Sequence, residues 1–362
     1  MPLRFVSLSF LLLAVTVGPT LTSGNLARGA KPGGTTAAAY AITDLGSPRY
    51  RNWGIYWSRA YGINEPDYQG LMDVIGWDDR GSAIWEVRSN GGVVNRNNLG
   101  MSMKVTAVND NGLMIVGAFD THLSAIVPGV GVIDLPGSAG FFPAAVNNLG
   151  HIVSQQQMFG YPELGKGAMW TIAADGAIEG PIDLGEFRPL DINDSDEMAG
   201  LQDCAAAIAW FEGGGLQVSK LPGLRPGNFG VATAINNWGE VVGYSMNTAL
   251  VTTGASFPFL WTPNQGLTAL GSLGGIEGRA TAINDGGQIV GWSYTSGRNS
   301  EQRAFFWESG KMFDLNGKIA ADNKRTLQSA DDINNAGHIV GSMFTLQSGT
   351  TTLKSFLLTP TP

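Results

Sequence analysis

Short apolar runs alternate with turns rich in glycine and asparagine along most of this chain, and one version of the pattern recurs. The stretch AINDGGQIVGWS, which begins at Ala282, reappears with small changes as AINNWGEVVGYS at Ala234 and DINNAGHIVGSM at Asp332. More divergent copies are AVNDNGLMIVG, AVNNLGHIV and DINDSDEMAG, which begin at positions 107, 145 and 191. Self-similarity at a fixed interval indicates an array of structural repeats.

The copies align on the asparagine that follows the apolar pair, here named the anchor asparagine. Successive anchors are 38 to 50 residues apart. In most copies a glycine stands three residues after the anchor, as expected for a hairpin turn in which Asn bonds its own backbone and Gly adopts a positive φ. Copies such as NDSDE suggest a calcium loop, but NNLG and NNWG have no carboxylate, so turn capping is the better interpretation. The anchors are Asn64, Asn109, Asn147, Asn193, Asn236, Asn284 and Asn334.

Each repeat contains four runs with the apolar spacing of β-strands. In the copy at Asn236 the first run is ATAIN (232–236) and the second is EVVGYS (240–245). The third run ends on an aromatic residue in most copies, as in SAIWEV and RAFFWES, and the fourth has the form GVIDLPG or KMFDLNG. Apolar runs of about four to eight residues bounded by Gly, Pro and Asn are typical of strands. Four short antiparallel strands every ~45 residues form the unit of a β-propeller blade.

The two ends of the repeat array complement each other. After Asn334 the chain supplies a second run, HIVGSM, and a third, KSFLLTP, but no fourth. AITDLGS (41–47) has the fourth-run pattern and precedes the first anchor. The sequence therefore predicts an all-β, seven-bladed β-propeller with four-stranded antiparallel blades, whose ring is closed by the N-terminal strand joining the last blade. An open solenoid is the alternative, and it would leave two strand edges exposed.

The first 39 residues do not follow the repeat. MPLR is a short basic end, and the apolar run FVSLSFLLLAVTV (5–17) has the length of the central region of a secretion signal. It is shorter than the ~18 residues expected of a membrane-spanning helix; a buried strand or helix is the alternative. We expect a signal peptide over residues 1–24, a flexible leader over 25–39 and a single propeller domain over 40–362. The protein is then secreted, extracellular or periplasmic, without membrane insertion.

Composition agrees with many short strands and tight turns. The chain has 51 glycines among 362 residues, and only 14% of its residues are charged, against about a quarter in typical globular proteins. The formal net charge of −8 argues against a nucleic-acid partner, because phosphate binding needs a basic face. Cys204 is the only cysteine, so no intramolecular disulfide is possible. Its small apolar surroundings predict a buried side chain rather than a nucleophile.

The consensus of the repeats is close to AINNxGxVVGxS followed by FLWxxGxxxDLGxLGG. The clearest copy is FPFLWTPNQGLTALGSLGG (257–275) with RATAINDGGQIVGWS (279–293). This pattern resembles the HAF-type extracellular repeat proteins, and the resemblance covers essentially the whole chain after the leader. It implies an exported, propeller-shaped repeat protein. It supplies no catalytic motif that transfers to these positions.

Few residues suggest catalysis or metal binding. His151 and His338 follow the turn glycine, where other copies have Glu240, Gln288 or Leu113, so we interpret them as solvated strand starts rather than ligands. No Cys and His spacing fits a metal site, and no nucleophile elbow or dinucleotide fingerprint is present. The sequence therefore identifies no catalytic residue, no metal ligand and no cofactor.

Basic residues recur at one position of the repeat. Five residues before the anchor, four of the seven copies have Arg or Lys, in a chain with only 22 such residues. In a closed ring these positions surround one mouth of the channel, where positive charge favours an anionic ligand. The connection before the first anchor (47–61) adds aromatic rings suited to stacking on sugars. The predicted ligand-binding residues are Arg59, Lys104, Arg188, Arg279, Trp53 and Trp57.

The alternative for these side chains is structural, with arginines paired to acidic residues of neighbouring blades and tryptophans wedged between sheets. Three functions remain open at this stage. The first is a non-enzymatic binding or interaction module for an anionic polysaccharide, that is an acidic glycan, or for an extracellular partner protein. The second is a polysaccharide-degrading hydrolase or lyase at the channel mouth, and the third is a purely structural surface-assembly protein. Because no catalytic residue can be named, the sequence favours the first.

Overall fold

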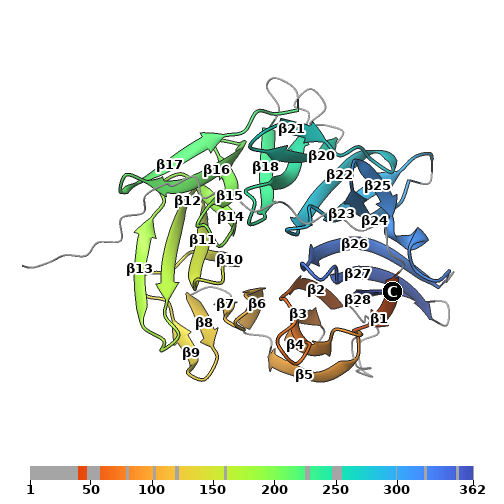
Figure 1. Cartoon of the computed structure of the whole chain (residues 1–362), viewed down its shortest axis with the longest axis horizontal. Coiled ribbons are helices and arrows are strands. Elements are labelled where there is room, and N and C mark those ends of the chain that lie inside the picture. The colour runs from red at the N-terminus through yellow and green to blue at the C-terminus, as the bar shows by residue number, and fades with distance from the viewer. Residues whose placement is uncertain are drawn as a thin grey trace, which may run out of the picture.

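Seven four-stranded blades surround a central axis in the computed structural model of this protein (Figure 1). The predicted seven-bladed β-propeller is therefore confirmed. The only helix in the described segments is a single 3₁₀ turn, η2 (Leu315–Gly317), and no described helix has the length and apolarity needed to cross a membrane. The predicted signal peptide and leader lie outside the described residues, which are 40–46, 58–78, 81–100, 103–118, 122–158, 161–224, 229–246, 255–298, 300–321, 324–347 and 350–361.

The blades are numbered in chain order, and the first strand of each is the inner strand, nearest the axis (Figure 1). Blade 1 contains β2 (Ser58–Ile63), β3 (Leu71–Asp78), β4 (Gly81–Arg88) and β5 (Val93–Gly100). Blade 2 contains β6 (Met103–Val108), β7 (Met114–Ala118), β8 (Leu123–Val127) and β9 (Gly131–Asp134). Blade 3 contains β10 (Phe142–Val146), β11 (His151–Met158), β12 (Tyr161–Ile172) and β13 (Ile178–Asp183). Blade 4 contains β14 (Arg188–Ile192), β15 (Met198–Gln202), β16 (Ala205–Glu212) and β17 (Gly215–Lys220).

The remaining blades follow the same order. Blade 5 contains β18 (Phe229–Ile235), β19 (Val241–Met246), β20 (Ser256–Thr262) and β21 (Gly266–Ala269). Blade 6 contains β22 (Gly274–Ile283), β23 (Ile289–Thr295), β24 (Gln302–Glu308) and β25 (Lys311–Asp314). Blade 7 contains β26 (Arg325–Ile333), β27 (Ile339–Gln347), β28 (Thr350–Pro360) and β1 (Tyr40–Asp44). A single parallel bridge between Ser256 and Glu277 joins the sheets of blades 5 and 6.

The ring closes where the sequence predicted. The N-terminal strand β1 pairs antiparallel with β28, from Tyr40 opposite Pro360 to Asp44 opposite Phe356 (Figure 1). Lys354 and Asp44 add an ion pair at 2.9 Å across this seam. Closure leaves every blade with a neighbour on both sides, so no blade presents a bare face to solvent.

The hydrophobic core is divided into seven clusters, one at each interface between neighbouring blades. At the closing interface, Val340 and Leu357 of blade 7 pack with Val74 and Trp85 of blade 1. A single blade is only one sheet thick and cannot enclose such a cluster alone. Each repeat therefore supplies one face of its blade to the interface with the preceding blade and the other face to the interface with the next blade.

Every inner strand contains a β-bulge at the same place, three residues before the anchor asparagine. In each of the seven pairings between the inner and second strands, the residue at this place has no partner across the ladder. A bulge bends its strand and redirects the neighbouring side chains. The bulged residues are Tyr61, Thr106, Ala144, Leu190, Thr233, Thr281 and Asp331.

One prediction outside the repeat motif is wrong. Cys204 lies with Asp203 in the two-residue turn between β15 and β16 and is partly exposed, not buried. Both residues have positive φ, 49° for Asp203 and 63° for Cys204, as in the type I′ turns that match strand twist. Gln202 and Ala205 form the strand pair on either side of the turn. The small apolar run of β16 therefore begins at Ala205, and Cys204 belongs to the turn.

Candidate functional site

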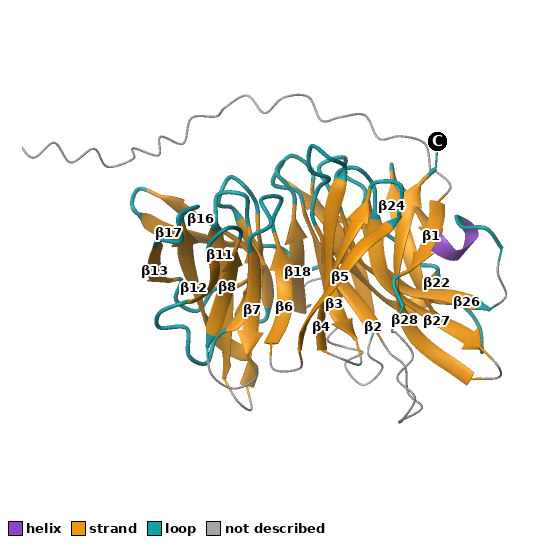
Figure 2. Cartoon of the chain, turned by 90° about the horizontal axis from the view of Figure 1, so that it is seen from below, coloured by secondary structure: helices purple, strands orange, loops and turns teal. Residues whose placement is uncertain are grey.

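The propeller has two faces, and each presents a different set of side chains around the axis. The turn from each anchor asparagine to the following glycine lies on one face, here named the anchor face. Gly337 of such a turn lies beside Pro360, so the C-terminal end of β28 marks this face at the top of Figure 2. The inner strands begin on the opposite face, which carries the predicted cationic residues and is here named the cation face.

Each anchor asparagine caps its own turn through its side-chain oxygen. In blade 5, Oδ1 of Asn236 accepts hydrogen bonds from the backbone N–H groups of Trp238 and Glu240 at 3.1 and 2.9 Å. The N–H of Gly239, at φ 73°, donates to the Asn236 carbonyl at 3.0 Å and closes the turn. In blade 4 Asp196 takes the glycine's place at φ 59°, a conformation that Asp tolerates better than most residues. The predicted turn chemistry is confirmed.

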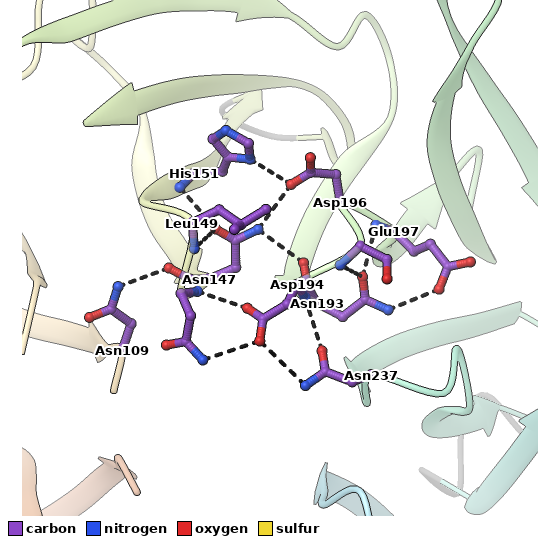
Figure 3. A network of polar contacts seen from close by, with 11 residues as sticks. Asn109, Asn147, Leu149, His151, Asn193, Asp194, Asp196, Glu197 and Asn237 are labelled. Carbon is purple, nitrogen blue, oxygen red and sulfur yellow. Dashed lines mark hydrogen bonds and ion pairs between the residues drawn. The ribbon is translucent and has the colours of Figure 1, made fainter. Parts of the chain in front are cut away.

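The amide nitrogens of the same side chains form a closed ring around the axis. Each Nδ2 donates to the backbone carbonyl of the anchor asparagine in the next blade, at 2.8–3.3 Å. The last of these bonds runs from Asn334 to Asn64 and completes the circle at 3.0 Å. Figure 3 shows the part of the ring formed by Asn109, Asn147 and Asn193. All seven anchors are buried, so a lost partner would leave a polar group unpaired away from water.

A second ring, here named the acidic rim, is formed by the residue that follows each anchor. Its side-chain oxygen accepts a hydrogen bond from the backbone N–H of the equivalent residue in the preceding blade, at 2.7–2.9 Å in six blades. The N–H of Asn335 donates to the carboxylate of Glu65 and closes this ring as well. The acidic rim consists of Glu65, Asp110, Asn148, Asp194, Asn237, Asp285 and Asn335.

The rim contains four carboxylates and three amides, and its charge is unbalanced. The amide of Asn148 donates to carboxylates on both sides, Asp110 at 2.7 Å and Asp194 at 3.1 Å. Burial, with smaller contributions from Asp110 and Asp285, raises the pKa of Glu65 to about 7. In the described part of the chain no lysine or arginine forms an ion pair with a rim carboxylate.

Behind the rim lies a cavity of ≈ 200 Å³. Its wall includes six of the seven anchor asparagines and the Ile or Val that precedes each of the seven. Asp191 also lines it and accepts the backbone N–H of Ile235 in the next blade at 2.9 Å. Asp332, at the equivalent place in blade 7, accepts the N–H of Ile63 in blade 1 at 2.9 Å. Burial raises the pKa of Asp191 to about 7 and that of Asp332 to about 6.

In blades 3 and 7 a histidine stands four residues after the anchor and reaches the next blade on this face. His338 is buried, and its Nε2 lies 2.8 Å from the Ser89 carbonyl of blade 1. Burial lowers the pKa of His338. His151 Nδ1 lies 2.5 Å from the Asp196 carboxylate of blade 4 (Figure 3). The prediction that these histidines are solvated strand starts is therefore wrong, because both side chains turn into the interface with the next blade.

On the cation face, two of the predicted ligand-binding residues meet at one aromatic ring. The Arg59 guanidinium lies 5.7 Å and the Lys104 ammonium 5.2 Å from the centre of the Tyr61 ring. Arg59 also forms a bidentate pair with Asp331 of blade 7 at 3.0 and 3.1 Å, although 48% of its side chain stays exposed. Burial and the charge of Arg59 lower the pKa of Lys104. The positive charges of Arg59 and Lys104 thus lie close together beside the carboxylate of Asp331.

The other two predicted cations lie apart from this pair. Arg279 stacks on Tyr244 of blade 5 at 4.3 Å and on Trp292 at 5.5 Å. Arg188 is only 5% exposed, and its guanidinium donates to the Gln155 side chain at 2.8 and 3.2 Å. All four cations contact the preceding blade, as the structural alternative anticipated, and Arg59 does so through the carboxylate of Asp331. Trp53 and Trp57 lie outside the described residues.

The acidic rim was not predicted from the sequence, because turn capping accounted for the anchor asparagines and assigned no role to the residues that follow them. The signal was nevertheless present, since Asp, Asn or Glu follows the anchor in all seven copies, while a hairpin turn requires this at none of them. No group of three or more His, Cys, Asp or Glu side chains among the described residues is arranged to hold a metal ion.

The comparisons with known proteins bear on the fold. No family model and no curated protein matches the sequence. Among solved structures, the chain is similar to "YCF48 bound to D1 peptide", with a TM-score of 0.54, 9% identity, and coverage of 91% of this chain and 99% of the other. A weaker similarity is to a structure from a study of two prolyl endopeptidases, with a TM-score of 0.47, 11% identity, and coverage of 82% of this chain and 45% of the other. Another is to the "Dos1 propeller", with a TM-score of 0.41, 10% identity, and coverage of 83% of this chain and 77% of the other. The protein thus belongs structurally to the β-propellers.

Proposed function

We propose that this protein is a binding module that takes an acidic ligand on its cation face. The observation that carries this proposal is the environment of the Lys104 and Arg279 side chains. Both are held against aromatic rings, and neither has a carboxylate partner among the described residues. A cation stacked on aromatic rings is already oriented and partly desolvated, so it loses little freedom when it meets an anion.

Arg59 adds a positive charge to this surface, but an ion pair with Asp331 offsets that charge. Its guanidinium is half exposed and lies beside Lys104, but Asp331 neutralises it. Exposed aromatic side chains stand on the same face, because Phe142 and Phe229 begin the inner strands β10 and β18 and are 57% and 42% exposed. Cations beside exposed aromatic faces suit a ligand with both ring faces and anionic groups, such as an acidic polysaccharide. Arg188 is buried in its interface and does not belong to the proposed surface.

The proposal includes action outside the cytoplasm. The basic start and the apolar run at 5–17 support export, and the resemblance of the repeats to HAF-type extracellular repeat proteins supports the same conclusion. An acidic polysaccharide or an acidic segment of an extracellular protein is then the ligand class to test first.

Retention on immobilised polysaccharides tests the ligand class. We expect retention on polygalacturonate and dextran sulfate but not on neutral dextran, and loss of retention near 1 M salt, where charges are screened within about 3 Å. The net charge of −8 opposes unspecific attraction to an acidic matrix. The double variant Lys104→Gln/Arg279→Gln should weaken binding about tenfold, at ~0.7 kcal/mol or more for each charge-assisted contact. Asp331→Asn should strengthen binding, because it frees Arg59.

Lys311→Gln is the matched control, because Lys311 is exposed on the outer strand β25, away from the cation face. It removes one of the two positive charges that the double variant loses and should leave retention unchanged. Equal retention on acidic and neutral matrices, or equal losses for the double variant and the control, would show that the cation face does not bind anions.

A further inference from the structure

The anchor face has a second cavity, which lies between blades 2 and 3 and has a volume of ≈ 370 Å³. Its wall is mainly apolar, with Leu113, Val127 and Pro128 on the blade 2 side and Leu149 and Ile172 on the blade 3 side. We name it the Leu149 pocket. Leu149 is 54% exposed in the first turn of blade 3, so the pocket has an apolar lip that reaches into solvent.

A departure from the repeat explains why an apolar pocket stands here. Blades 3 to 7 carry His, Glu or Gln four residues after the anchor, and these side chains bond to the anchor or to the next blade. In blade 6, for example, Gln288 accepts from Asn284 at 2.8 Å and donates to Glu308 at 2.9 Å. Blade 2 has Leu113 at this place, and its side chain cannot form such bonds. Leu113 therefore adds an apolar surface to the gap between blades 2 and 3, where Asn111 and Asn148 supply the polar part of the wall.

The Leu149 pocket adjoins the cavity behind the acidic rim. Asn109 and Asn148 line both cavities. Asn148 is also the rim amide that holds the Asp110 and Asp194 carboxylates on either side of it. Asn148 therefore links a mainly apolar cavity to carboxylates that have no basic partner among the described residues.

We propose that this surface binds a protein segment in which an apolar residue lies next to lysine or arginine, with the apolar side chain in the Leu149 pocket and the basic side chain over the acidic rim. Charge complementarity selects the basic residue, because the rim has four carboxylates and no internal counter-charge. The mainly apolar cavity selects the neighbouring residue, because burial of an apolar side chain supplies affinity and an ion alone would leave the pocket empty. The site lies on the face opposite the proposed acidic-ligand surface and is independent of it.

Selection from a phage-displayed library of random 12-residue peptides, with the whole chain immobilised, tests the proposal. We expect enriched peptides to place Lys or Arg within a few positions of Leu, Ile, Met or Phe. A synthetic copy of an enriched peptide should bind with an affinity that falls as salt is raised, because the rim contact is electrostatic. Enrichment of acidic peptides, or no enrichment at all, would overturn the proposal.

Two variants separate the pocket from the rim. Leu149→Ser removes the apolar lip, and Ser195 stands at the same place in blade 4. Asp110→Asn/Asp194→Asn removes two charges, and three blades already carry Asn there. Each should weaken peptide binding about tenfold in fluorescence anisotropy. Leu149→Ser should leave the unfolding midpoint close to that of the wild type. The rim variant also removes the two acceptors of the Asn148 amide, so its unfolding midpoint is measured together with its affinity.

Val132→Ser is the matched control for the pocket variant, because Val132 is 56% exposed on the outer strand β9 of blade 2. It should leave the dissociation constant unchanged. Equal affinities for wild type, Leu149→Ser and the rim variant would overturn the proposal. Sedimentation of the protein alone tests a second copy as the occupant, and self-association that Leu149→Ser abolishes would assign the pocket to that copy and overturn a foreign segment.

Discussion

Three carboxyl groups at the anchor face retain protons that ordinary Asp and Glu side chains release. Glu65, Asp191 and Asp332 each accept a backbone N–H from a neighbouring blade. Burial raises the pKa of Glu65 and Asp191 to about 7 and that of Asp332 to about 6. Glu65 and Asp332 lie at the interface between blades 7 and 1. At the scale of single residues, the closing interface is therefore sensitive to pH.

The direction of this sensitivity follows from linkage. The unfolded chain releases these protons near pH 4, so between about pH 4 and 7 the folded protein binds more protons than the unfolded chain. Their contribution to the free energy of unfolding therefore decreases as the pH rises through that window. Asp191→Asn cannot ionise and removes one such contribution. We expect the urea midpoint of the wild type, relative to that of Asp191→Asn, to be higher at pH 5 than at pH 8.

Asp175→Asn is the control for this comparison, because Asp175 lies in an exposed turn of blade 3. Its midpoint should follow that of the wild type at both pH values. A constant difference between wild type and Asp191→Asn across the pH range would contradict a proton held at Asp191.

At the scale of elements, the bulge in each inner strand explains a glycine in the motif IVGWS. In blade 5 a Cβ on Gly243 would lie 2.0 Å from the Val231 carbonyl oxygen. The bulge at Thr233 moves the start of β18 so that this carbonyl stands over β19. Gly76, Gly200, Gly291 and Gly341 meet the equivalent carbonyl at 2.1–2.2 Å. The glycine and the bulge thus occur together in five blades, whereas Val116 and Ser154 stand at the glycine's place in blades 2 and 3.

Gly243→Ala tests this association. The new methyl group would force the inner strand of blade 5 away from the second strand, and overpacking of this kind costs about 1–3 kcal/mol. We expect a lower free energy of unfolding in urea titrations. Gly215→Ala is the control, since its Cβ would have only the end of the Gln217 side chain within reach, at 3.9 Å. Equal stability of the two variants would show that the inner strand yields without cost.

At the scale of the whole molecule, closure depends on one short strand. Tyr40 to Asp44 cover the edge of β28, whose residues Phe356, Leu357 and Leu358 are fully buried. Tyr40 also packs edge to face on Phe306 of blade 6, with ring centres 6.2 Å apart. The strand therefore completes blade 7 and contributes to its interface with blade 6.

A chain that begins at residue 46 lacks β1 and should expose the unpaired edge of β28. We expect aggregation and a broad, less cooperative thermal transition, because the open edge is a template for strand pairing. A chain that begins at residue 38 retains β1 and is the control. A monomeric, cooperatively unfolding product of the shorter chain would show that the ring does not need this strand.

The sequence allowed the fold to be predicted in detail because the repeat samples the same local chemistry seven times. The strand runs, the turn glycines and the displaced fourth run at the N-terminus are each local features with a period. The candidate site was predicted less well, because a position in a repeat does not state which way its side chain points. Arg188 and Arg279 hold the same repeat position, but one is buried on Gln155 and the other is stacked on Tyr244.

By itself, the sequence determined the number of blades, their strands and the closure of the ring, since hydrophobic period and turn chemistry act over a few residues. The tertiary structure alone decided the two hydrogen-bonded rings and the Leu149 pocket. Asn64 and Asn334 are 270 residues apart, and only a closed circle makes them neighbours. The pocket arises because Leu113 of one blade faces Leu149 of the next, a pairing of two faces that no single repeat contains.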